Sequence, residues 1–166
     1  TDDCAVMRAG LGVRLREAGG KRIQTVKAES EGLSLRGEWE REVRGPGLDL
    51  SALKDTPAAA VIKGIKGELV PLFATRVERT AYAVRQGRSK VEAALDRGRI
   101  EAGERTLELC ELELELKSGP TQGLYALARR LAEAAPMRLS FVSKAERGYR
   151  LHAGQAVGEA VKQARV

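Results

Sequence analysis

Histidine and cysteine are nearly absent from this sequence, and their scarcity excludes several kinds of site. The 166 residues contain one histidine, His152, and two cysteines, Cys4 and Cys110. Neither cysteine belongs to a Cys-x-x-Cys pair, which argues against a zinc framework. One histidine near the C-terminus argues against serine–histidine or cysteine–histidine catalysis and against histidine-rich metal sites. We interpret Cys110 as a small buried residue of a strand rather than a nucleophile.

Aromatic residues and long apolar runs are also scarce. Aromatics make up 4% of the chain and do not alternate with basic residues, which weakens the case for single-stranded nucleic acid bound by stacking. No apolar run is long enough to span a membrane, and no signal peptide is recognisable. No P-loop, dinucleotide-binding glycine motif or kinase signature occurs. We therefore expect a cytoplasmic protein with no membrane partner.

Charged residues, by contrast, are abundant. They make up 31% of the chain against 43% hydrophobic residues, a composition typical of one globular domain. Lysine and arginine total 29 against 23 acidic residues, which gives a net charge of +6. A basic balance favours polyanions such as phosphorylated metabolites or nucleic acid. The alternative is a soluble surface with a modest charge bias.

Alternation with period two predicts a mainly β, antiparallel fold with one or more short helices. Gly19-Gly20, Gly87 and Arg97-Gly98 are predicted turns. Asp49 or Ser51 is a candidate cap for a short helix, and Ser143 with Glu146 has capping-box spacing. A helix is predicted over residues 122–135. The predicted strands cover residues 11–16, 22–28, 33–43, 72–86, 90–96 and 107–117.

The last of these strands alternates glutamate with leucine. Glu111, Glu113 and Glu115 project from one face, roughly 7 Å apart. Carboxylates this close repel one another, and a divalent cation with a preference for oxygen ligands resolves the repulsion. Glutamate is disfavoured in strands, so three in register is an unusual way to build a plain surface. The alternative is the solvated outer face of an amphipathic strand.

Basic residues gather on other strands, where their side chains could bind phosphate oxygens. A barrel with cations on one wall and carboxylates on another would hold a highly charged anion together with its metals. The alternative is surface charge with weak salt bridges. The candidate basic positions are Arg14, Arg16, Lys27, Arg36, Arg79 and those of the Ser143–Tyr149 turn. Glu92 and Asp96 share a face of the predicted strand 90–96 and could add carboxylates to the same cavity, or that face could be solvated.

Several motifs occur in the order found in one known family. The chain resembles the CYTH domain of the triphosphate tunnel metalloenzymes, in particular bacterial inorganic triphosphatases. The glutamate run and the Ser143–Tyr149 turn are the most specific of these motifs. The resemblance implies an antiparallel eight-stranded β-barrel, or tunnel, with a hydrophilic lumen. The matching segments are 14–16, 24–27, 32–40, 71–79, 92–98, 110–117 and 143–149.

The resemblance also implies roles for individual residues. Inorganic triphosphate or polyphosphate would be the ligand, Mg²⁺ or Mn²⁺ the cofactor, and no catalytic base is assigned. The metal carboxylates would be Glu111 and Glu113, supported by Glu38, Asp96 and Glu92. The substrate contacts would be Arg14, Arg16, Lys27, Arg36, Arg79, Lys144 and Arg147, with Glu92 grouped beside them.

One departure from the family pattern concerns the start of the chain. The family opens with a Glu-x-Glu-x-Lys strand, and no such strand precedes Thr1. We therefore expect residues 1–151 to be a CYTH-like domain that is incomplete at its N-terminus. Residues 152–166 are expected to be a tail or linker, which in many bacterial relatives would lead to a CHAD-like domain.

The resemblance favours metal-dependent hydrolysis of inorganic triphosphate to pyrophosphate and phosphate. A first alternative is a non-catalytic module that binds polyphosphate or RNA. Such a module needs no metal, and its affinity should fall steeply with salt. A second alternative is a hydrolase of an organic triphosphate such as thiamine triphosphate or ATP.

Overall fold

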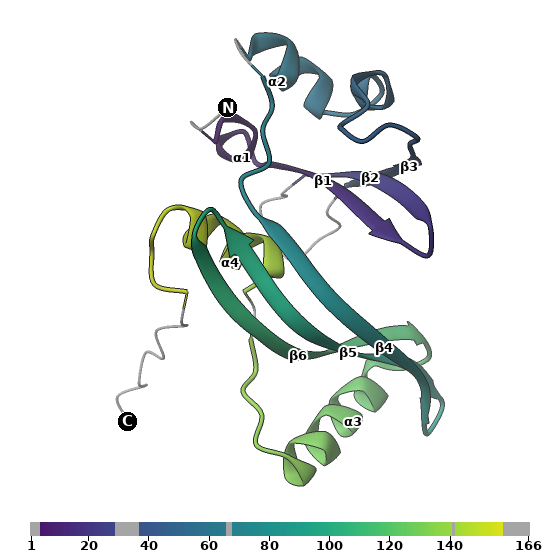
Figure 1. The fold of residues 1–166 in the computed structure, drawn as a ribbon. Helices are drawn as coiled ribbons and strands as arrows, with labels where there is room; N and C mark the ends of the chain where they lie inside the picture. Colours follow the sequence, from purple (N-terminus) through teal and green to yellow (C-terminus); the bar gives the residue numbers. More distant parts are fainter. Residues whose placement is uncertain (1–3, 29–36, 66–67, 141, 158–166) are drawn as a thin grey trace, which may run out of the picture. The chain divides into compact units, whose positions relative to one another are not determined.

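The computed structural model describes residues 4–28, 37–65, 68–140 and 142–157, and it divides into two compact units (Figure 1). The first unit is Thr1–Val70 and the second is Pro71–Val166. The first contains α1 (Ala5–Arg8), β1 (Leu11–Ala18), β2 (Lys21–Ala28), β3 (Glu38–Glu42), the 3₁₀ helix η1 (Leu50–Leu53) and α2 (Ala58–Gly64). The second contains β4 (Ala74–Gln86), β5 (Ser89–Ala102), β6 (Arg105–Ser118), α3 (Thr121–Ala134) and α4 (Lys144–His152).

The sheet of the first unit has the order β1-β2-β3 and is antiparallel throughout. The predicted Gly19-Gly20 turn is confirmed, since both glycines have the positive φ that a tight hairpin requires. Leu11 and Val26 form a buried cluster with Leu53 and Ala58. This cluster fixes which face of the sheet is apolar, and period-two alternation places Arg14 and Arg16 on the opposite face. Asp49 caps η1, as predicted, by accepting a hydrogen bond from the backbone of Ser51.

The sheet of the second unit has the order β4-β5-β6 and is likewise antiparallel. Its strands are 13, 14 and 14 residues long. Gly87 and Gly103 have positive φ in the two connecting turns, where a side chain would be strained. Consecutive strands pair with one another, so residues far apart along the chain become neighbours across the sheet.

The predicted turn at Arg97-Gly98 is wrong, because β5 continues through both residues to Ala102. Gly98 lies opposite Val77 in the β4–β5 ladder. A β-carbon added at Gly98 would overlap the carbonyl oxygen of Arg76. Glycine at this position therefore permits a close backbone approach within a strand, a known alternative to a turn.

Helices α3 and α4 cover different parts of this sheet (Figure 1). Gly123 of α3 packs tightly on Ser89 at the start of β5. Leu151 of α4 packs with Ile100 and Ala102 further along β5. Ser89 and Ile100 differ in parity along the strand, so the two helices contact opposite faces. The predicted helix over 122–135 is confirmed as α3, and α4 is longer than the short helical turn expected after Ser143.

The structure confirms a mainly β, antiparallel chain with a few helices. The six strands of the described residues form two three-stranded sheets, and neither is a closed eight-stranded barrel. Cys110 is exposed rather than buried, and it projects from the face of β6 opposite Glu111 and Glu113. Within the described ranges, every helix is too short or too polar to cross a bilayer.

Candidate metal and anion site

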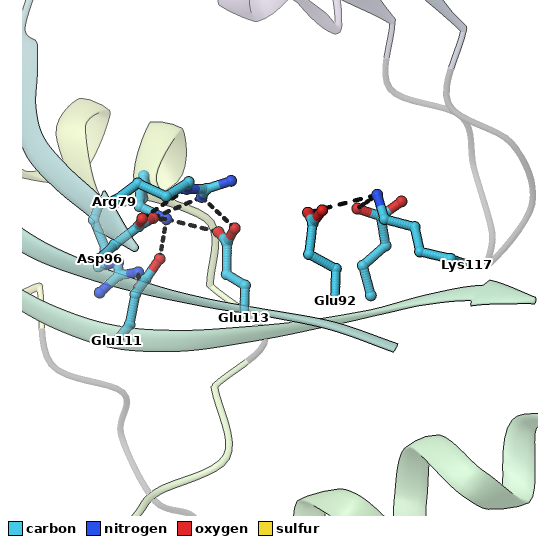
Figure 2. Close-up of polar contacts among 9 residues, drawn as sticks. Arg79, Glu92, Asp96, Glu111, Glu113 and Lys117 are labelled. Atoms are coloured by element: carbon cyan, nitrogen blue, oxygen red, sulfur yellow. Dashed lines mark hydrogen bonds and ion pairs between the residues drawn. The ribbon is translucent and has the colours of Figure 1, made fainter. Parts of the chain in front are cut away.

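The ladder of the second sheet brings charged residues from three strands into one row. Asp96 of β5 lies directly opposite Arg79 of β4 on one side and Glu111 of β6 on the other. Glu113 lies opposite Ala94, one pair further along the same face. Directly opposed residues share a face of the sheet and have close side chains. Figure 2 shows these four charged side chains grouped on one side of the sheet.

The three acidic members form a tight carboxylate group. One oxygen from each of Asp96, Glu111 and Glu113 lies within 4.8 Å of the other two. The Asp96 side chain is fully buried, whereas that of Glu113 is 47% exposed. Three carboxylates at this distance repel one another strongly unless cations lie among them.

Arg79 supplies the first of these cations. Its Nε and Nη2 each donate a hydrogen bond of 2.7 Å to the two oxygens of Asp96. Its Nη2 also lies 2.5 Å from an oxygen of Glu113. The two-pronged bond to Asp96 raises the pKa of Arg79 and holds the pKa of Asp96 below its ordinary value. Both groups are therefore charged at neutral pH.

Two further cations come from α4. Lys144 Nζ lies 2.7 Å from Asp96 and 2.6 Å from Glu113, and it also contacts Glu111. Arg147 binds Glu111 through Nη2. Burial by itself lowers the pKa of Lys144, but its three carboxylate partners outweigh burial and raise it. Burial likewise raises the pKa of Glu113, and Lys144 and Arg79 reverse the direction and lower it.

The position of α4 depends on a cap and on a close aromatic contact. Ser143 accepts a 3.1 Å hydrogen bond from the backbone of Glu146, which confirms the predicted capping interaction. Gly148 lies against the ring of Phe73, where a β-carbon would overlap the ring. The same ring packs edge-to-face on Tyr149. The sequence patterns assign no role to Phe73 or Gly148, although glycine in the middle of a helix is itself a signal of close packing.

A second charged group lies further along the same face of the sheet (Figure 2). Glu92 lies opposite Glu115 in the β5–β6 ladder. Lys117 Nζ lies 2.8 Å from Glu115 and 3.5 Å from Glu92. The hydrogen bond to Glu115 raises the pKa of Lys117. Glu92 is thus placed with Glu115 and Lys117 rather than among the three close carboxylates.

The remaining predicted site residues belong to the first unit. Lys27 and Glu38 lie opposite each other in the β2–β3 ladder and form an ion pair of 3.0 Å. Arg14 and Arg16 are exposed on the same face of that sheet. Glu38 therefore has Lys27 as its partner within this unit. Arg36 lies outside the described residues.

The carboxylate group suits a divalent metal ion. Carboxylate oxygens are the ligands that Mg²⁺ and Mn²⁺ prefer, and three from two adjacent strands converge at this point. The surrounding charges are balanced, because three cations (Arg79, Lys144 and Arg147) face three carboxylates (Asp96, Glu111 and Glu113). A bound metal ion could therefore replace side-chain cations as the partner of these carboxylates without leaving their negative charges uncompensated.

Comparison with known proteins places the chain in a known family. The CYTH domain matches residues 1–149 of the chain. The inorganic triphosphatase of Haemophilus influenzae is 34% identical over 155 residues, an alignment that covers 87% of this chain. The chain spans only 42% of the length of that relative. With the family match running over nine-tenths of its length, the chain belongs to the CYTH domain family.

Proposed function

We propose that this chain binds inorganic triphosphate with a divalent metal and supports its hydrolysis to pyrophosphate and phosphate. The observation that carries the proposal is the charge-balanced group of Arg79, Lys144 and Arg147 with Asp96, Glu111 and Glu113. The relative from Haemophilus influenzae is an inorganic triphosphatase by name, which supports the same substrate for this chain. Triphosphate is a compact polyanion, and its charge calls for both cationic side chains and metal ions.

The balance of charge favours a metal-dependent site over a metal-free polyanion module. Each of the three cations is already bound to a carboxylate, so an anion that took up the N–H groups already in use would have to displace an ion pair. A divalent ion at the carboxylates would add two positive charges and loosen these pairs. Anion binding should then require the metal, whereas a simple basic surface would bind polyphosphate or RNA without it.

The described residues suggest which side chains would bind the metal and which would bind the phosphate groups. Asp96, Glu111 and Glu113 would hold Mg²⁺ or Mn²⁺, which when bound would neutralise phosphate charge and activate water. Arg79, Lys144 and Arg147 would bind and orient the phosphate oxygens. Arg147 Nε is buried and has no hydrogen-bond partner among the described residues. A buried donor of this kind is costly, and a phosphate oxygen would satisfy it.

We extend the proposal to the first unit and to the domain as a whole. Arg14, Arg16, Lys27 and Arg36 would be further phosphate contacts, with Glu38 and Glu92 as supporting carboxylates. The strands would form part of the eight-stranded tunnel that family membership implies, within a domain that includes residues 1–151. Residues 152–166 would be a tail or linker. A crystal structure of the longest natural form with a triphosphate analogue would test each of these contacts.

The decisive experiment is an assay of phosphate release from a panel of triphosphates. Because the chain spans only 42% of its relative, the assay should use both this chain and the longest natural protein that carries it. We expect release from inorganic triphosphate with Mg²⁺ or Mn²⁺ and none with EDTA. Faster release from thiamine triphosphate or ATP would replace the proposed substrate. Tight, metal-independent and salt-sensitive binding without release would favour the binding module instead.

A further inference from the structure

One lysine contacts all three carboxylates of the candidate metal site. Lys144 Nζ lies 2.7 Å from Asp96 and 2.6 Å from Glu113, and it also contacts Glu111. Within the described part of the chain, Arg79 reaches two of these carboxylates and Arg147 reaches one. The ammonium group has three N–H donors and no acceptor, so it can donate to each carboxylate in turn. It therefore lies where a metal ion held by the same oxygens would have to lie.

We propose that Lys144 holds the place of the metal ion in the metal-free protein and is exchanged for it when the metal binds. The inference rests on the proposed function, because it takes Asp96, Glu111 and Glu113 as the metal ligands. It adds that the same lysine limits metal affinity when no anion is present.

The three cations differ in how easily they could leave. Arg79 is opposite Asp96 in the ladder and holds both of its oxygens, a rigid two-pronged geometry. Lys144 is the first residue of α4 and carries its charge on a flexible four-carbon stem. Its side chain is 18% exposed against 44% for that of Arg79, so the flexible stem and not exposure distinguishes the two cations. Lys144 can therefore withdraw without moving either the sheet or the helix.

The exchange has a consequence for the anion. An ammonium released from three carboxylates regains the capacity to bind phosphate oxygens. Metal and anion should then strengthen one another's binding, and this coupling must be equal in both directions. In the absence of an anion, Lys144 opposes the metal because the two compete for the same oxygens.

The first test measures Mn²⁺ affinity of the chain by isothermal titration calorimetry, with no phosphate present. We expect Lys144→Met to bind Mn²⁺ about tenfold more tightly than the wild type, within the usual range for coupled sites. Lys117→Met is the matched control, since Lys117 lies on the same face but contacts Glu92 and Glu115. It removes the same positive charge and leaves the contacts of the three carboxylates intact. The Mn²⁺ affinity of this variant should therefore differ from that of the wild type by less than about twofold.

The second test needs no variant and so does not depend on the folding of Lys144→Met. An amine-reactive ester labels lysines in the wild-type chain, and mass spectrometry measures the modification of each one. We expect Mg²⁺ alone to increase the labelling of Lys144 several-fold, because exchange would free its ammonium. Lys117, which is 44% exposed, should be labelled equally with and without Mg²⁺.

Glu111→Gln separates failure of this inference from failure of the proposed function. Weaker Mn²⁺ binding by Glu111→Gln, together with tighter Mn²⁺ binding by Lys144→Met, supports both the metal site and the exchange. Weaker binding by Glu111→Gln, with no gain for Lys144→Met over Lys117→Met and no Mg²⁺ effect on labelling, overturns the exchange alone. Unchanged Mn²⁺ affinity in Glu111→Gln overturns the metal site, and the exchange with it.

Discussion

The ring of Phe73 packs directly against Gly148 in the middle of α4, at a distance that leaves no room for a β-carbon. Because α4 also carries Lys144 and Arg147, this contact sets how close two of the three cations come to the carboxylates. We expect Gly148→Ala to destabilise the protein by about 1–3 kcal/mol, the usual cost of overpacking. Urea unfolding would measure the change, and metal titration would show a weaker or altered site.

The companion variant for this contact is Phe73→Leu, which should relieve the overlap that Gly148→Ala creates with the ring. A double-mutant cycle of the two substitutions should therefore show a coupling of about 1 kcal/mol or more, typical of residues in contact. Strictly additive effects would mean that α4 can move away from Phe73 at no cost, and that the contact does not position the helix.

Glu111→Gln tests the carboxylate group itself. Glu111 is bound by both Lys144 and Arg147, so its neutralisation leaves these cations with one negative partner fewer. We expect loss of metal-dependent phosphate release and a decrease of about 1–2 kcal/mol in the unfolding free energy of the metal-free protein. Denaturation in EDTA and the phosphate-release assay would measure the two effects separately.

Glu115→Gln is the matched control for that substitution. Glu115 is on the same face of β6, two residues beyond Glu113, and its partner is Lys117. Its side chain is 66% exposed, so stability should change by no more than about 0.5 kcal/mol. A loss of activity as large as that of Glu111→Gln would show that the metal site extends further along the strand than we propose.

Acid should destabilise the metal-free protein through Asp96 and Glu113. The pKa of Asp96 is lowered first by its hydrogen bonds from Arg79, and burial opposes this only in part. The pKa of Glu113 is raised by burial, but Lys144 and Arg79 lower it overall. A carboxylate whose pKa is lowered by folding contributes its full stabilisation when the pH is above its ordinary pKa. That contribution is lost as the pH falls through the pKa of the folded state.

The ordinary values are 3.8 for Asp96 and 4.5 for Glu113. We therefore expect the unfolding free energy in EDTA to be nearly constant from pH 7 to about pH 5 and to decrease progressively below about pH 4.5. In Asp96→Asn part of this stabilisation is already missing at neutral pH, so the decrease in acid should be shallower. An equally steep decrease in Asp96→Asn would assign the acid sensitivity to other groups.

Arg79→Lys tests the two-pronged bond to Asp96. Lysine keeps the charge but cannot donate through a planar fork. We expect weaker triphosphate binding and a loss of about 1 kcal/mol of stability, whereas Arg76→Lys should have little effect. Arg76, whose side chain is 68% exposed, forms an ion pair with Glu101 on the other face of the sheet. Chemical denaturation and anion titration of both variants would make the comparison.

Period-two alternation predicted the carboxylate face correctly because the face from which a side chain projects is set within a single strand. Glu111 and Glu113 alternate with leucine, and the structure places both on the charged face. Parity likewise predicted that Asp96 and Glu92 share a face. It could not say that ladder register brings Asp96, rather than Glu92, to Glu111 and Glu113. Register depends on where the hairpins turn. The incorrect prediction of a turn at Arg97-Gly98 therefore prevented prediction of the β5–β6 register.

The contribution of α4 was beyond the reach of sequence patterns. The capping spacing of Ser143 and Glu146 predicted a helix start, and the structure confirms it. The distance of Lys144 from three carboxylates depends on how that helix packs on Phe73 and Ile100, which is a tertiary contact. The roles of Arg14, Arg16, Lys27, Arg36 and Glu38 remain predictions that the anion-bound structure proposed above would test.

The meander of β4, β5 and β6 also bears on the order in which the molecule folds. Its hairpins bring Arg79, Asp96, Glu111 and Glu113 together through local pairing, and local contacts form early. Lys144, by contrast, is separated by 31 and 33 residues from Glu113 and Glu111, and it arrives only when α4 docks. Until then, three carboxylates would share one arginine. We expect the final step of refolding to be slower when dissolved divalent cations screen the attraction between this transient excess of negative charge and the cations of α4.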